Sequence, residues 1–162
     1  MPAAFRHQAA GDVQAAVACC AAATAIAERF GDADLFALTV HTQGQMLVDA
    51  GRVEEGLRML DEAMVAVTAG EVGPVASGIV YCGVIVGCRA AYEPRRAQEW
   101  TAALARWCER QPDMVAFSGR CLVHRAEIMQ LRGAWPDALH EARRAGERCA
   151  LARNASAAAQ AL

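Results

Sequence analysis

The residues of this chain that could do chemistry are its cysteines, histidines and paired acids, and few of them have the spacing of a site. Cys121 and His124 lie three residues apart, so on one helix both side chains could reach the same metal ion. No second Cys/His pair has a ligand spacing. We therefore expect a buried thiol and a hydrogen-bonded histidine here, and the sequence predicts no metal site.

Patterns for catalysis are also scarce. The sequence contains neither the Gly-x-Ser-x-Gly turn of a hydrolase nor the Gly-x4-Gly-Lys-Ser/Thr loop that holds phosphates. The acid pairs Glu54-Glu55 and Asp61-Glu62 are predicted to be solvated charges on a helix. We therefore expect a protein that binds rather than catalyses, with no catalytic residue and no cofactor. An enzyme on a helical scaffold is the most distant alternative.

Charge and cysteine usage limit the partners and the location. The chain has 162 residues with a net charge of −2, whereas nucleic-acid-binding surfaces are strongly basic, so no direct binding to nucleic acid is expected. Seven cysteines, an odd number, and the lack of a leader-like N-terminus predict a reducing, cytoplasmic location. The uncharged stretch 72–88 is shorter than the about 20 residues of a membrane span. It is also rich in glycine, so we expect a tightly packed helix and no membrane.

A degenerate internal repeat organises the chain. Residues of four predicted turns recur at intervals of 40, 41 and 41: Gly11, Gly51, Tyr92 and Gly133. A small residue follows five positions after each turn: Ala16, Gly56, Ala97 and Ala138. Seven positions before the last three turns stand Gly44, Ile85 and Ala126, of which two are small. Small residues at fixed places are what close contact between helices requires.

The elements between these turns are predicted to be helices. Apolar residues recur at steps of three and four, and the predicted helices cover residues 12–30, 33–50, 52–69, 75–92, 94–110, 114–132 and 135–152, after a short one over 3–9. Short connections make neighbours antiparallel. The predicted fold is all-α, a helix-hairpin solenoid of about seven helices plus an N-terminal stub. It forms one domain over 1–152, with repeat units of about 1–30, 31–72, 73–112 and 113–152, and a truncated or flexible tail over 153–162.

The tryptophans are predicted to pack inside this array. Trp100 and Trp107 lie seven residues apart and therefore on one helix face, and Trp135 follows a turn. We expect all three to be core or repeat-interface residues rather than a cage for a ligand.

The hairpins resemble the tetratricopeptide repeat. That family has a pattern of large–x2–Leu–Gly–x2–aromatic on the first helix and Ala–x3–Phe on the second. In this chain the corresponding positions hold Val40, Gln43, Gly44 and Leu47, then Gly56 and Leu60. The resemblance implies a right-handed superhelix of hairpins. The period near 40 exceeds the family's 34, which longer helices explain.

The long alanine-rich repeats also resemble those of actinobacterial transcriptional regulators of the LuxR family. The stretches that carry the resemblance are 51–64, 95–100 and 121–133. In that family the repeats lie between an optional nucleotide-binding module and a DNA-binding helix-turn-helix, and the motifs of both are absent from this sequence. The resemblance implies a bacterial scaffold for protein–protein interaction or ligand sensing in transcriptional regulation. The chain is then a segment of such a regulator, a truncated relative or a stand-alone repeat protein.

The resemblance places a partner-binding groove on the first helix of each hairpin. The residues at the family's ligand-facing spacing are His41, Gln45, Asp49, Cys82, Val86, Arg89, Arg120, Glu127 and Gln130. Their mixture of charged, hydrogen-bonding and apolar side chains suits a protein or peptide partner. The alternative is that these are ordinary packing or surface positions. A second functional alternative is a structural module that forms a homodimer through an exposed apolar end of the array.

Overall fold

The computed structural model describes the backbone of residues 2–111 and 115–160, and over these ranges it contains α-helices and no strand. The helices are α1 (Pro2–Ala9), α2 (Val13–Phe30), α3 (Ala33–Asp49), α4 (Val53–Ala69), α5 (Pro74–Ala90), α6 (Pro94–Glu109), α7 (Val115–Leu131) and α8 (Trp135–Gln160). The all-α prediction is confirmed, and the first seven helices begin and end within two residues of the predicted bounds.

The last helix differs from the prediction. We expected a helix that ends near residue 152 and a flexible tail after it, but α8 continues to Gln160. Alanine is the strongest helix former, and the stretch 155–159 contains four alanines, which accounts for the added turns. Residues 161 and 162 lie outside the described part of the chain.

The four predicted turns share one backbone conformation. Gly11, Gly51 and Gly133 have φ angles of 78°, 81° and 78°, and Tyr92 at the fourth turn has a φ of 57°. Glycine adopts this left-handed conformation freely, whereas a residue with a Cβ loses about 1–2 kcal/mol there. Tyr92 therefore keeps this backbone conformation without glycine, and the intervening turns at Gly31 and Gly70, with φ angles of 66° and 78°, share it.

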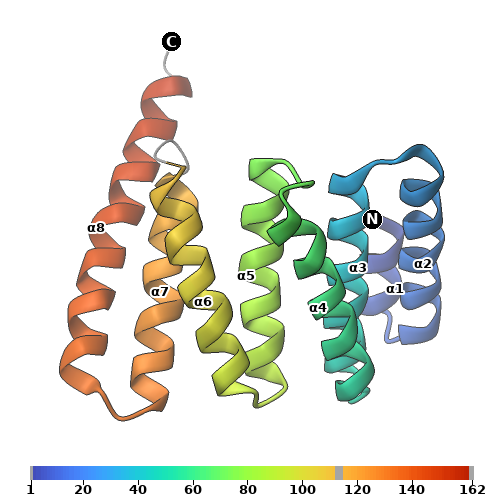
Figure 1. Ribbon diagram of the computed structural model, residues 1–162, viewed down its shortest axis with the longest axis horizontal. Helices are drawn as coiled ribbons and strands as arrows, with labels where there is room; N and C mark the ends of the chain where they lie inside the picture. The colour runs from blue at the N-terminus through green and yellow to red at the C-terminus, as the bar shows by residue number, and fades with distance from the viewer. Residues whose placement is uncertain (1, 112–114, 161–162) are drawn as a thin grey trace. The chain divides into compact units, whose positions relative to one another are not determined.

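The helices group into two compact units, residues 1–93 and 94–162. In the first unit α1 packs on α2, α2 on α3 and α3 on α4, and α5 contacts both α3 and α4. In the second unit α7 contacts α6 and α8. Consecutive helices within each unit run antiparallel (Figure 1). Each unit therefore consists of helical hairpins packed side by side.

In the first unit α3 and α4 touch backbone to backbone. A Cβ atom on Gly44 would lie 2.9 Å from the carbonyl oxygen of Gly56, and one on Gly56 would lie 2.6 Å from that of Gly44. The side chain of Leu60 is fully buried next to this contact. A Cβ on Gly87 of α5 would lie 2.6 Å from Cδ1 of Leu60, so Leu60 occupies the space between α4 and α5.

Candidate functional site

Six of the nine predicted groove residues lie in the first unit, on α3 and α5. Two of them join these helices: Gln45 Nε2 donates a hydrogen bond to the carbonyl oxygen of Gly83 at 3.0 Å, and His41 is buried against the same glycine. A Cβ on Gly83 would lie 2.6 Å from Cδ2 of His41, so the ring fits because this residue is glycine. His41 and Gln45 therefore pack α3 against α5, which is the alternative interpretation of these positions.

The other four residues of this unit differ in exposure. Cys82 is buried, Arg89 is half-buried, and Val86 and Asp49 are exposed. Asp49 accepts a hydrogen bond of 3.3 Å from Gln8 Nε2 and so links α3 to α1. Only Val86 and Asp49 of these four are thus exposed.

Burial of His41 makes the stability of the folded chain depend on pH. Its Nδ1 lies 2.9 Å from the carbonyl oxygen of Leu38, which can only accept, so Nδ1 carries the proton. Burial lowers the pKa of His41 from the usual 6.5, and hydrogen bonds with the backbone of Leu38 and Ala37 oppose this effect. Below pH 6.5 the unfolded chain therefore binds a proton that the folded chain does not. The free energy of unfolding must decrease as the pH falls from 6.5 toward the folded pKa.

Substitution of His41 by glutamine is expected to reduce this pH dependence. Between about pH 7 and about pH 5, the free energy of unfolding should fall less steeply in His41→Gln than in the parent chain. Urea unfolding followed by circular dichroism at several pH values measures the slope. His140→Gln, at an exposed position of α8, is the matched control and should keep the parent slope. An equal slope in His41→Gln and the parent would contradict the role of His41.

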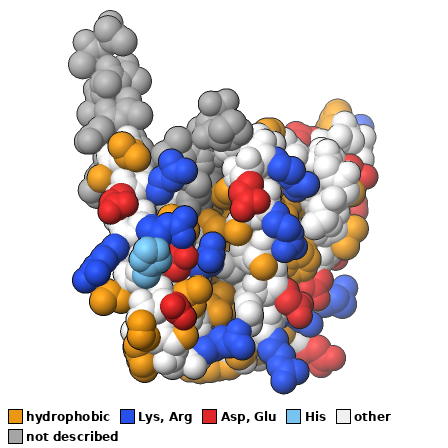
Figure 2. All heavy atoms as spheres, turned by 60° about the vertical axis from the view of Figure 1, so that its left-hand side comes forward, with side chains coloured by type: hydrophobic (Ala, Val, Ile, Leu, Met, Phe, Trp, Pro, Cys, Tyr) orange, Lys and Arg blue, Asp and Glu red, His pale blue; other side chains and the backbone are white. Residues whose placement is uncertain are grey.

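Charged side chains cover the outside of the second unit and tie α7 to α8. Figure 2 brings the α8 side forward and shows basic and acidic side chains interspersed with apolar ones. Glu141 of α8 is buried, with Oε1 at 3.2 Å from Nη2 of Arg125 in α7 and at 3.0 Å from Nη1 of Arg144. Because the Glu141 carboxylate is buried, removing Arg125 would leave it without the ion-pair partner that joins α8 to α7.

Cys121 and His124 are both buried in α7. The Cys121 thiol lies 4.0 Å from the carbonyl oxygen of Thr101, and His124 Nδ1 lies 3.4 Å from Oε2 of Glu127. A hydrogen bond with Cys108, together with burial, raises the pKa of the Cys121 thiol, which favours the protonated form. In the described part of the chain, no three His, Cys, Asp or Glu side chains are grouped to hold a metal ion.

The remaining predicted residues lie on α7, and two of them border a groove. Arg120 and Gln130 are exposed, and Glu127 is half-buried. Glu127 and Gln130 line a groove of about 560 Å³ between α7 and α8. The groove that the structure shows is thus formed by both helices of one hairpin, whereas the prediction used first helices alone.

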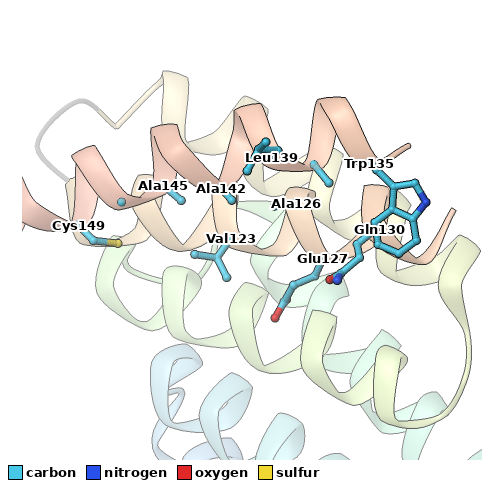
Figure 3. A pocket seen from close by; sticks show the side chains of 11 residues that line it. Val123, Ala126, Glu127, Gln130, Trp135, Leu139, Ala142, Ala145 and Cys149 are labelled. Atoms are coloured by element: carbon cyan, nitrogen blue, oxygen red, sulfur yellow. The ribbon is translucent and has the colours of Figure 1, made fainter. Parts of the chain in front are cut away.

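The groove is lined largely by small and apolar side chains. Its walls are Val123, Ala126, Glu127 and Gln130 of α7, and Trp135, Ala138, Leu139, Ala142, Ala145, Gly146 and Cys149 of α8. In Figure 3, Trp135 and Gln130 are at one end and Cys149 is at the other. Ala138 and Ala145 are buried, whereas Leu139 is 53 % exposed. The surface is therefore a shallow apolar channel along two helices.

Trp135 corrects a prediction. We expected a packed side chain, but Trp135 is 61 % exposed at the mouth of the groove. Its equivalent at the second turn, Val53, is also exposed. Each is the first residue of its helix, α8 or α4, so it lies at the end of the hairpin rather than within the helix contact. Trp100 and Trp107 are half-buried.

No protein-family model, no curated protein and no solved structure matches this chain. The repeat and the groove between α7 and α8 are therefore the features of the chain that indicate its function.

Proposed function

We propose that this chain is a non-catalytic helical scaffold that binds a protein partner by accepting an α-helix of that partner. The observation that carries this proposal is the groove between α7 and α8. Its volume is about 560 Å³, and its lining is mostly apolar with Glu127 and Gln130 at one wall. An apolar channel along two helices is the surface that helix-in-groove recognition uses.

The repeat supports a helix as the occupant. Positions 82 residues apart are equivalent, as Gly51 is to Gly133, so the hairpin of α7 and α8 corresponds to that of α3 and α4. In the first unit α5 lies against both α3 and α4. There Leu57 and Leu60 are buried, while the equivalent Leu139 and Ala142 line the open groove. The groove is therefore the counterpart of a surface that holds a helix elsewhere in the same chain.

The polar wall indicates which helix would fit. The side-chain amide of Gln45 donates a hydrogen bond to the backbone of α5. The residue equivalent to Gln45, 82 residues later, is Glu127. A carboxylate accepts hydrogen bonds where an amide can donate them. A partner helix should therefore offer a cationic or hydrogen-bond-donating side chain opposite Glu127, beside small residues that allow close approach.

We further propose that the hairpins form a tetratricopeptide-like right-handed solenoid in a segment or relative of a cytoplasmic LuxR-type regulator. The four equivalent turns and the repeat residues described above support this proposal. The net charge of −2 favours a protein partner over DNA for this part of such a regulator.

Selection from a displayed library of helical peptides tests the proposed function. The selected peptides should be amphipathic helices with small residues at intervals of four. Leu139→Glu should weaken their binding at least about tenfold, because it places a charge in the apolar channel, and titration calorimetry measures this change. Val65→Glu replaces an apolar side chain that is 68 % exposed on α4, and this control should bind normally. Equal binding by the Leu139→Glu chain would contradict the proposal.

A further inference from the structure

The exposed face of α2 is made of small, uncharged side chains. No charged residue occurs between Asp12 and Glu28. The exposed positions lie three or four residues apart and so on one side of the helix: Gln14, Ala18, Ala21, Ala22, Ala25 and Ile26. Among the described helices α2 is long and apolar enough to cross a membrane by length and composition, and 17 % of it is buried. The surface of α2 is therefore unusually apolar.

The equivalent positions of α4 and α8 are charged, whereas α6 holds Glu99 followed by Ala102 and Ala103. Ala18, Ala21 and Ala22 correspond to Arg58, Asp61 and Glu62 in α4, which lie 40 residues later. In α8 the same positions hold His140, Arg143 and Arg144, all of them exposed. Charged residues at these positions are what a solvated helix face carries. The absence of any charged side chain from α2 between Asp12 and Glu28 indicates that this face contacts protein rather than water.

We propose that α2 of one copy of the chain docks in the groove between α7 and α8 of a second copy. This inference rests on the proposed function, because it names the partner helix of the same groove. Alanines on α2 permit the close approach that Gly83 and Gly87 of α5 permit in the first unit. Both surfaces are therefore apolar and lined largely by small side chains.

Charge also matches at one point. Glu127 is the charged residue among the groove-lining side chains that the structure describes. Arg29 is exposed in the last turn of α2, on the same side as Ala18, Ala22 and Ala25. Docking along the groove would bring a single cation to a single carboxylate, which selects one direction of the helix.

Such a contact uses two different surfaces, so it is heterologous. Each copy then offers one groove and one α2, and copies join head to tail into a ring or an open chain. A mixture of two variants distinguishes this arrangement from an interface that uses the same surface on both copies. A variant with a damaged α2 and a variant with a damaged groove should each be monomeric, but together they should form a one-to-one dimer.

Sedimentation velocity over about 1–100 µM of the whole chain measures the assembly. The parent chain should increase in mass with concentration. Ala22→Glu and Leu139→Glu should each remain monomeric over this range, and their equimolar mixture should form dimers. Val65→Glu should assemble as the parent does. Circular dichroism should show parental helix content in every variant, so that loss of assembly is not loss of folding.

Exchanging the charges of Arg29 and Glu127 tests the direction in which α2 lies in the groove. Arg29→Glu should weaken assembly a few-fold, as expected for a partly exposed ion pair, and adding Glu127→Arg in the same chain should restore it. Persistent assembly of Ala22→Glu, or a mixture that stays monomeric, would overturn the proposed interface. The proposed interface would also be overturned if the parent chain floated with phosphatidylcholine vesicles and Ala22→Glu did not. In that case α2 would face lipid.

The two proposals can fail separately. A parent chain that is monomeric throughout the range, yet binds helical peptides in a manner that depends on Leu139, would reject the second copy as partner and leave the scaffold function standing. A chain that neither assembles nor binds such peptides would reject both.

Discussion

Substitution of Gly56 by valine should destabilise the first unit by about 3 kcal/mol, because it forces two helix backbones apart. A Cβ at this position would lie 2.6 Å from the carbonyl oxygen of Gly44 and 2.9 Å from the backbone nitrogen of Val48. Neither atom belongs to a side chain that could rotate away. Relief therefore requires α3 and α4 to separate, which would expose the buried Leu60 and Met64.

Urea unfolding followed by helix signal measures this effect as a shift of the transition midpoint. Gly146→Ala is the matched control, because Gly146 lies within α8 and a Cβ there would meet no atom within 4 Å. That control should stabilise the chain by up to about 1 kcal/mol through helix propensity. A midpoint for Gly56→Val within error of the parent would show that the two helices can separate without loss.

Replacing Leu60 by alanine should cost about 3 kcal/mol, since it empties a fully buried site between α4 and its neighbours. A second substitution, Gly87→Ala, should destabilise the parent chain but stabilise the Leu60→Ala chain. On its own, the added methyl group would lie 2.6 Å from Cδ1 of Leu60 and should destabilise the chain by about 1–2 kcal/mol. After Leu60→Ala that atom is gone, so the methyl group fills part of the cavity and favours the helix.

A double-mutant cycle of urea unfolding measures the coupling between the two positions. We expect a coupling of about 1 kcal/mol or more, in the direction that makes the double variant more stable than the sum of the single changes. If Gly87→Ala costs the same in both backgrounds, Leu60 does not occupy the space between α4 and α5. Val65→Ala, at an exposed position of α4, should show no coupling with Gly87→Ala.

The helices could be predicted from the sequence because neighbouring residues determine where each helix begins and ends. Asp12 and Asp32 accept hydrogen bonds from the backbone nitrogens of Ala15 and Leu35, and so begin α2 and α3 where the sequence indicated. Small residues at a fixed distance from the turns predicted the contact at Gly44 and Gly56. The end of α8 was misplaced because alanine supports a helix without any packing signal.

The candidate groove was predicted only in part. Glu127 and Gln130 were found through the spacing of first helices, but the α8 wall was missed, because that spacing ignores second helices. The internal repeat held the missing signal, since Leu139 stands 82 residues after the buried Leu57. His41 and Gln45 could not be assigned from their polarity. Their role depends on Gly83 of a helix about 40 residues away, which only the packed structure shows.

The left-handed residue at Tyr92 has a consequence for how such chains diverge. At Tyr92 the turn keeps the positive φ angle of the glycine turns without the glycine that marks them in the sequence. Related helical arrays can then have the same turn conformation although their sequences have little in common. Backbone angles at the turns are therefore a useful complement to matching amino acids when such arrays are compared.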